Sequence, residues 1–248
     1  MPVRERELGD RERKVMMNRS SELFLHEEIM LLALRDDKGT IEFGANYTHA
    51  VAGAVIAELL LNDRIRIDEQ SKRKKLVVVT SATQLGDPLL DECLEKINSA
   101  KKPSKIENWV GKFANTKNLK HRVAEQLCKR GILKVDQDQV LLIFSRTVYP
   151  EVDPRPENEI IDRMRRAIFT QTGDVDPRTA VLISLANAAE VLRYAFDKKK
   201  LKEQKTRIEA IANGDLVGQA TKEAIQAMQA AVMVAVMIPA IVTATTVH

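Results

Sequence analysis

Apolar residues recur every three to four positions along most of the chain, a pattern that predicts a protein built mainly from helices. The predicted helices cover residues 22–35, 50–61, 89–98, 106–113, 117–130, 158–169, 177–196 and 202–212. Residues 64–68 and 76–80 instead form β-rich runs, the first with a period of two, as the strands of a short hairpin do. The fold class that we predict is mainly α: a single multi-helical domain with short β-hairpins, one of them apolar and protruding.

The two ends of the chain differ from this helical body. Residues 1–20 alternate Arg with Glu and offer almost nothing to bury, so we predict a flexible N-terminal arm followed by one domain over residues 21–248. The apolar run at residues 230–242 is shorter than the roughly 20 residues that a membrane-spanning helix needs. We interpret it as a core helix that Pro239 ends or kinks.

The stretch from residue 117 to residue 150 combines a basic helix with an apolar hairpin. Lys117, Lys120 and His121 are spaced so that one helix would place all three on the same face. Gly131 is the expected end of this helix. A cationic helix face beside an apolar hairpin fits the surface of an anionic membrane.

The hairpin itself is predicted from two β-rich runs, 132–135 and 140–144, joined by the polar residues 136–139. The second run supplies the residues that would contact a membrane or a second copy of the chain. These are Val140, Leu141, Leu142, Ile143 and Phe144. The simpler interpretation, a core strand behind a solvated helix face, stays open, because an apolar strand is most often part of the core.

A helix followed by a hairpin is also the plan of a winged-helix nucleic-acid-binding protein, which we keep as the alternative function. A wing that contacts DNA should carry Lys or Arg at its tip, whereas the predicted loop carries Asp136 and Asp138. We therefore favour lipid and expect no nucleic acid as partner.

Charge supports a polyanionic partner without identifying it. The 248 residues include 39 Lys and Arg and 35 Asp and Glu, a net charge of only +4. The basic residues are nevertheless clustered, at 72–75, 101–102, 129–130, 163–166 and 198–200. Basic clusters on a nearly neutral chain indicate nucleic acid or an anionic lipid surface, although each cluster alone is also typical of solvated helix ends and loops.

The sequence contains no recognisable catalytic or cofactor-binding motif. We find no glycine-rich phosphate loop, no dinucleotide fingerprint and no nucleophile elbow. Neither the four scattered histidines nor the pair Cys93 and Cys128 has the spacing of a zinc site or a disulfide framework. We therefore predict no catalytic residues, no metal and no cofactor, and interpret the protein as a non-enzyme. Without an apolar leader at its start, it is expected in the cytoplasm.

Several stretches, taken in order, resemble the Golgi phosphoprotein 3 family. They are LHEEIMLLALRD at 25–36, AEL at 57–59 with DRIRI at 63–67, GDPLLDE at 86–92, VAEQL at 123–127 with KRGIL at 129–133, and LISLA at 182–186. The resemblance implies a helical domain that binds phosphatidylinositol 4-phosphate and lies peripherally on membranes. In eukaryotic members this is the cytosolic face of the Golgi, where they retain glycosyltransferases as adaptors and contact the coatomer coat.

The resemblance also implies where a lipid headgroup would bind. The two arginines that the family has before its apolar hairpin fall on Lys117 and Lys120, so positive charge is kept. The family's tryptophan and a further arginine fall on Gly44 and Gly53. Tyr47, His49 and His121 are the further headgroup neighbours that we expect.

The family's hairpin implies self-association as well as membrane contact, so the resemblance adds a homo-oligomer and membrane-enzyme clients to the expected partners. Acids alternate with bases in the N-terminal arm, unlike the basic arm of eukaryotic members. This difference and the two glycines indicate a divergent member, prokaryotic or otherwise.

Overall fold

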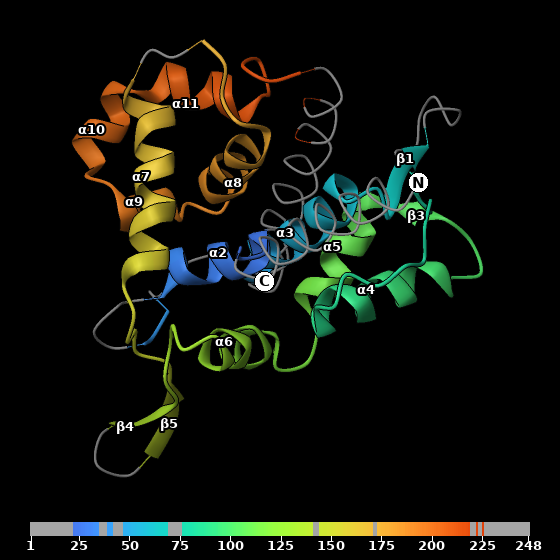
Figure 1. The fold of residues 1–248 in the computed structure, drawn as a ribbon, viewed down its shortest axis with the longest axis horizontal. Coiled ribbons are helices and arrows are strands. Elements are labelled where there is room, and N and C mark those ends of the chain that lie inside the picture. Colours follow the sequence, from blue (N-terminus) through green and yellow to red (C-terminus); the bar gives the residue numbers. More distant parts are fainter. Residues whose placement is uncertain are drawn as a thin grey trace, which may run out of the picture.

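The computed structural model describes residues 22–34, 39–41, 47–68, 76–140, 144–170, 173–218, 222 and 225. It confirms the mainly α-helical fold (Figure 1). The helices are α2 (Leu25–Ala33), α3 (Tyr47–Leu61), α4 (Pro88–Asn98), α5 (Ile106–Ala114), α6 (Leu119–Lys129), α7 (Arg155–Phe169), α8 (Pro177–Ala188), α9 (Leu192–Ala195), α10 (Lys198–Glu203) and α11 (Lys205–Ala212). The strands are β1 (Ile65–Asp68), β2 (Leu76–Val79), β3 (Ser104–Lys105), β4 (Asp136–Val140) and β5 (Phe144–Val148). The predicted N-terminal arm and the run at 230–242 lie outside the described residues.

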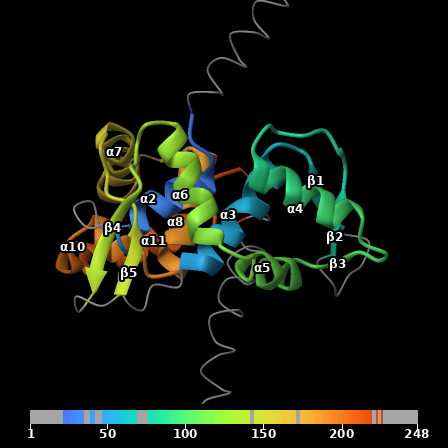
Figure 2. The same ribbon diagram turned by 90° about the horizontal axis from the view of Figure 1, so that it is seen from below.

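Helix α2 forms the centre of the hydrophobic core. All nine of its residues are buried, and it packs against α3, α6, α7, α8 and α9. Helix α3 is Ala-rich and apolar on all sides, and it contacts α4, α5 and α8 as well. Because neither helix has a wide polar face, both must be surrounded by other elements. Figures 1 and 2 show the remaining helices around this pair.

A small antiparallel sheet lies at the end of α3. Strand β1 pairs with β2 in the register Ile65 to Val79, which confirms the hairpin predicted from the β-rich runs. Strand β3 adds two residues to the other edge of β2, where Leu76 is opposite Lys105. A strand of two residues is too short to produce a periodic pattern, so the sequence did not predict it.

Local chemistry explains where α4 and α8 begin. The carboxylate of Asp87 accepts hydrogen bonds from the backbone N–H groups of Leu89 and Leu90, at 3.0 and 2.8 Å. Asp176 caps α8 in the same way, through the N–H of Thr179 at 2.8 Å. Both helices also have proline in their first turn, where a missing N–H costs nothing.

The helix predicted over residues 177–196 is wrong as one element. Helix α8 ends at Ala188, Glu190 has a φ of +59°, and α9 begins only at Leu192. A left-handed residue stops the helical backbone, and here it is neither glycine nor proline. The break therefore has no signal in the residue types.

A projecting hairpin forms in this part of the chain, but its predicted boundaries are wrong and its two described strands, DQDQV and FSRTV, are mostly polar rather than apolar. Strands β4 and β5 pair from Asp136 opposite Val148 to Val140 opposite Phe144. The predicted polar loop 136–139 is thus the first strand, and the predicted strand 140–144 spans the turn, of which 141–143 lie outside the described residues. The comparison with a winged helix had assigned Asp136 and Asp138 to the loop that joins the strands. Both residues lie on β4 instead, and the residues between the two strands in the sequence are Leu, Leu and Ile.

Cross-strand polar pairs explain this register. Asp138 lies opposite Arg146, whose guanidinium donates two hydrogen bonds to the carboxylate, at 3.0 and 2.6 Å. Pairs of opposite charge on neighbouring strands stabilise a hairpin. A register that is set by such polar pairs cannot be predicted from the alternation of buried and exposed residues along a strand.

Within the described residues, no helix has both the length and the apolar character needed to cross a bilayer.

Candidate functional site

The β4–β5 hairpin projects from the helical body beside α6, as the lower part of Figure 1 shows. Its base is held by the backbone N–H of Lys134, which donates to the Pro150 carbonyl at 3.0 Å. Two apolar side chains flank this base in solvent: Val135 is 57% exposed and Val152 is 51% exposed. A projecting hairpin with exposed apolar residues at its base can contact a surface outside the domain.

Helix α6 begins next to this base, but later than the sequence predicted. Lys117 lies in the turn before the helix, and Asn118 has a φ of +57°. Only Lys120 and His121 lie in the first helical turn, so the predicted helix face of three residues is wrong. The three side chains still belong to one short segment, because Lys117 lies only two residues before Leu119, where the helix begins. The first turn of α6 holds no acidic residue, and no side chain of the described residues caps this positive helix end.

Tyr149 connects α6 to the hairpin. Its hydroxyl is hydrogen-bonded to Nδ1 of His121 at 2.8 Å. The Nζ of Lys120 lies 5.8 Å from the centre of the same ring, within the range of a cation–π contact. Because Tyr149 follows β5 directly and is buried, it fixes both side chains relative to the hairpin.

The electrostatics of this cluster favour an anion. Burial lowers the pKa of Lys120, and the positive charge of Arg146 on β5 lowers it further. Burial also raises the pKa of Tyr149, so this ring is neutral near pH 7. Arg146 is already paired with Asp138 on β4, whereas Lys120 has no ion pair within the described residues, so a negative group beside Lys120 would offset the repulsion that it experiences. We call Lys117, Lys120 and Arg146 the cationic base of the hairpin.

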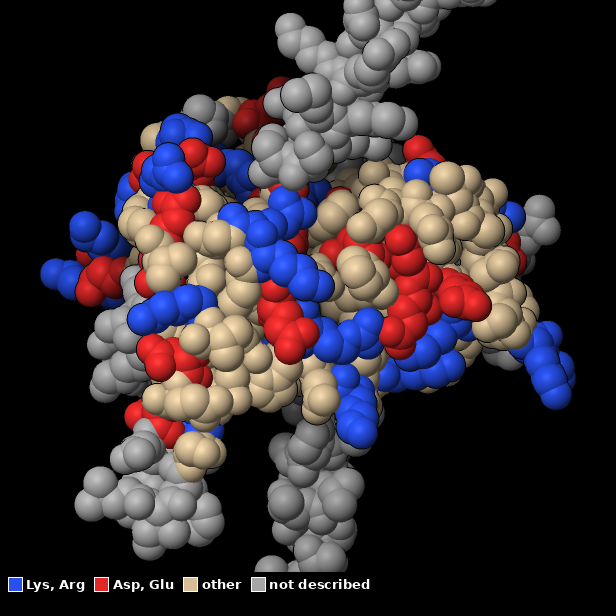
Figure 3. All heavy atoms as spheres, turned by 60° about the horizontal axis from the view of Figure 1, so that its bottom comes forward, with Lys and Arg blue, Asp and Glu red and all other residues tan. Residues whose placement is uncertain are grey.

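Positive charge is local on this side of the molecule. Figure 3 shows Lys and Arg interspersed with Asp and Glu over the visible face, rather than gathered into one field. The next cation of α6, Arg122, is paired with Glu92 at 2.6 Å, and Glu92 also binds Lys96. Lys117, by contrast, is exposed, and no ion pair or hydrogen bond of its side chain occurs within the described residues.

The other expected headgroup neighbours are not joined to this cluster. Tyr47 and His49 lie in the first turn of α3 and are half-buried, which raises the pKa of Tyr47 and lowers that of His49. Among the residues that the structure describes, no hydrogen bond or ion pair links them to Lys117 or Lys120. Gly53 is buried in the middle of α3, and Gly44 lies outside the described residues.

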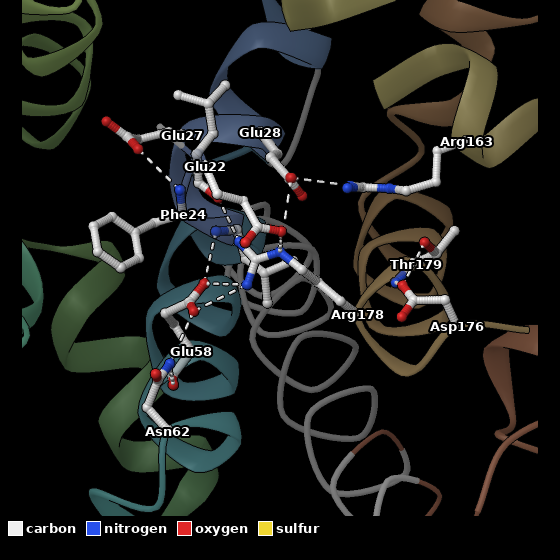
Figure 4. Close-up of polar contacts among 12 residues, drawn as sticks. Glu22, Phe24, Glu27, Glu28, Glu58, Asn62, Arg163, Asp176, Arg178 and Thr179 are labelled. Carbon is white, nitrogen blue, oxygen red and sulfur yellow. Dashed lines mark hydrogen bonds and ion pairs between the residues drawn. The ribbon is translucent and has the colours of Figure 1, made fainter. Parts of the chain in front are cut away.

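A buried ion-pair network, which we did not predict, lies around the start of α2 (Figure 4). Arg178 of α8 donates to both oxygens of Glu58 on α3, at 3.0 and 3.1 Å, and also to the carbonyl of Leu23. Glu58 is only 3% exposed and also accepts from the N–H of Leu25, at 2.9 Å. This one guanidinium therefore ties α8 to α3 and to the start of α2.

The same network continues along α2 through two adjacent acids. Glu28 accepts from Arg163 of α7 at 2.9 Å, and Glu27 accepts from Arg130 at 3.0 Å. Buried acids require cationic partners, so Glu27 and Glu28 within an otherwise apolar helix were a usable signal. The sequence does not show which cations pair with these acids, because Arg163 is 135 residues away from Glu28.

Comparison with known proteins identifies a relationship that covers most of the chain. The family model described as Golgi phosphoprotein 3 (GPP34) matches residues 25–228. The chain is also similar to vacuolar protein sorting-associated protein 74 of Eremothecium gossypii, with 26% identity over 213 residues. That alignment covers 73% of this chain but only 64% of the relative, which is less than two thirds of its length.

Proposed function

Because the chain belongs to the Golgi phosphoprotein 3 family, we propose that it is a peripheral membrane adaptor that docks on an anionic phospholipid surface. The observation that carries this proposal is the cationic base of the hairpin, Lys117, Lys120 and Arg146, beside a pair of strands that projects from the domain. The sequence that joins the two strands, Leu141 to Ile143, is apolar. Cations would meet the headgroups while this apolar segment enters the acyl region.

The headgroup that we propose is a phosphoinositide with an exposed phosphate, of the phosphatidylinositol 4-phosphate type. The positive end of α6, which has no acidic residue in its first turn, supports an anion at Lys120. Lysine offers a point charge where arginine offers a two-pronged fork, so we expect lipid charge to contribute more than headgroup shape.

The adaptor role extends this proposal to proteins. The name of the fungal relative connects that protein with protein sorting. We infer that this chain likewise holds membrane-enzyme clients at the bilayer, at the Golgi if its source has one. No transferred group or bond cleavage is part of this role, so we propose a non-enzymatic protein.

Removing the two lysines of the cationic base should weaken binding to anionic vesicles about thirtyfold in the double variant Lys117→Ala, Lys120→Ala. Each cation near an anionic membrane contributes about 1 kcal/mol, and about 2 kcal/mol corresponds to this factor. Co-sedimentation with vesicles containing phosphatidylinositol 4-phosphate or phosphatidylserine, in rising salt, measures the effect. Wild-type binding should decrease with salt, because exposed charges are screened.

A matched control removes the same charge elsewhere. The double variant Lys199→Ala, Lys200→Ala changes two exposed lysines of α10, which Figure 1 shows far from the hairpin. Its binding should stay within about twofold of wild type, because α10 lies away from the docked hairpin and salt screens exposed charges that are distant from the membrane. Equal losses in both double variants, or sedimentation that is unchanged from low to high salt, would contradict the proposed docking surface.

A further inference from the structure

A second positively charged surface lies on α10, away from the hairpin (Figure 1). This helix has only six residues, with the sequence KKKLKE, so most of its side chains are cationic. All of its lysines are exposed, and none has an ion pair or a side-chain hydrogen bond within the described residues. They are Lys198, Lys199, Lys200 and Lys202, which we call the α10 lysine cluster.

Local helix chemistry disfavours lysines at these positions. Lys198 and Lys199 are the first two residues of α10, at the positive end of the helix, where acidic side chains are favoured. Lys198 and Lys202 are four positions apart and therefore share a helix face, on which like charges repel each other. Because α10 buries none of its residues, packing on the core does not offset this repulsion. An arrangement that neither local stability nor packing requires is typical of a functional surface.

The backbone that carries the cluster is nevertheless fixed. The carboxylate of Asp197 accepts hydrogen bonds from the backbone N–H groups of Lys199 and Lys200, both at 3.0 Å. These N–H groups are therefore occupied, and the lysine side chains are the groups available to a partner. Phe196, just before this cap, packs against Phe169 of α7 with ring centres 5.6 Å apart. A fixed backbone limits the ordering that binding requires to the lysine side chains themselves.

Helix α7 separates the cluster from the membrane contact proposed above. Its first residue, Arg155, lies shortly after Pro150 at the base of the hairpin, and its last, Phe169, contacts Phe196 beside α10. The 15 residues of α7 span about 22 Å, more than twice the screening length of about 8 Å at physiological salt. A membrane docked on the hairpin is therefore too far away to neutralise the α10 lysine cluster.

The residue types of α10 favour carboxylates over nucleic acid. The helix contains no arginine, which would bind phosphate through two parallel hydrogen bonds, and no aromatic ring on which a base could stack. Lysine is a point charge on a flexible stem, so it can bind carboxylates that are not held in one geometry. Six helical residues span about 9 Å, the length of about three residues of an extended chain. A short acidic run of a polypeptide matches this length.

We propose that the α10 lysine cluster docks an acidic segment of a partner protein, a short extended run rich in Asp and Glu. Carboxylates of this run lie between Lys198 and Lys202 and offset the repulsion of the two cations. The surface gives the protein a second contact, separate from the hairpin. This inference goes beyond membrane docking and does not depend on it, because the charges of α10 are the same with or without a bilayer.

Fluorescence anisotropy with a labelled acidic peptide tests the docking surface in the absence of lipid. The probe is a peptide in which Asp and Glu alternate, and the reference peptide has Asn and Gln at the same positions. We expect the probe to bind the full chain at low salt with a micromolar Kd and to be released at high salt, because exposed charges are screened. The reference peptide should not bind. A probe that shows no saturable binding at low salt would overturn the proposal.

Two pairs of exposed lysines provide matched variants. The double variant Lys198→Gln, Lys202→Gln removes two charges of the cluster and should weaken binding of the acidic peptide at least about fivefold. The double variant Lys101→Gln, Lys102→Gln removes the same charge from the chain before β3 and should change the affinity less than about twofold. Equal losses in the two variants would show a general attraction to a positive protein and would contradict a docking surface on α10.

The stability of the α10 variant distinguishes binding from a role in the fold. Lys198→Gln, Lys202→Gln should keep or raise the urea midpoint, because it removes a repulsion between like charges. A clearly lower midpoint would assign the two lysines to the fold and count against the proposal.

A competing polyanion tests the class of the partner. Single-stranded DNA with the same number of charges should bind the wild-type chain more weakly than the acidic peptide. Tighter binding of the DNA, lost in Lys198→Gln, Lys202→Gln, would overturn the acidic protein segment and identify the cluster as a nucleic-acid contact.

Discussion

Replacing Arg178 by methionine is expected to lower the free energy of unfolding by about 3–5 kcal/mol, because it leaves buried charges without their partner. Glu58 and Glu28, at 3% and 2% exposure, both lie within 4 Å of this guanidinium. Burial already raises the pKa of Glu28 despite the nearby Arg178 and Arg163. Methionine fills a similar volume, so loss of charge rather than a cavity is tested. Urea unfolding followed by circular dichroism measures the change.

The control for Arg178 is an exposed ion pair in the same chain. Lys205 of α11 lies 3.7 Å from Glu209, with side-chain exposures of 73% and 54%. Lys205→Met should change the unfolding free energy by less than about 0.5 kcal/mol, because solvent screens such pairs. If Arg178→Met were as stable as Lys205→Met, the network would not be what fixes α8 against α3 and α2.

Placing a carboxylate at the tip of the hairpin should abolish most membrane binding and leave the fold intact. Leu142→Asp removes an apolar side chain worth about 1.5–3 kcal/mol on burial, and it adds a charge of the same sign as the lipid. We expect vesicle affinity to fall at least about thirtyfold, with an unchanged urea midpoint. The midpoint is expected to hold because β4 and β5 pair with each other and project away from the helices (Figure 1).

Thr206→Asp is the matched control for charge, since this position is exposed and belongs to α11, which Figure 1 shows far from the hairpin. It should leave both vesicle binding and stability within error of wild type. An unfolded or aggregated Leu142→Asp variant would show that the tip is buried, and the hairpin would then have no direct role at a membrane.

These tests rest on a fold that the sequence predicted well wherever an apolar face is buried. Helices α4, α5 and α7 begin and end within a few residues of their predicted bounds, because each buries one stripe of side chains. The hairpin was misplaced for the opposite reason: its register follows the polar pair of Asp138 and Arg146 rather than a buried face. The break at Glu190 was invisible because no residue type signals it.

The candidate site was predictable in part. The sequence identified Lys117 and Lys120 as a basic pair before the hairpin, but the residues around them are brought together by tertiary contacts. Tyr149 lies 28 residues beyond His121, and Arg146 belongs to a strand whose position was predicted wrongly. The acids of the buried network were visible as charged residues in apolar helices. Their partners were not, since Arg178 is 120 residues from Glu58.

Insertion of the hairpin is the claim on which the proposed function depends most, and fluorescence quenching tests it directly. The chain has a single tryptophan, Trp109, which is 4% exposed and therefore shielded from lipid. In the variant Leu142→Trp, the added emission should shift to the blue on anionic vesicles and be quenched by brominated acyl chains, whereas wild-type emission should not change. Protein that sediments with the vesicles while the added emission stays unquenched would show binding without insertion, and would contradict the role that we propose for the hairpin.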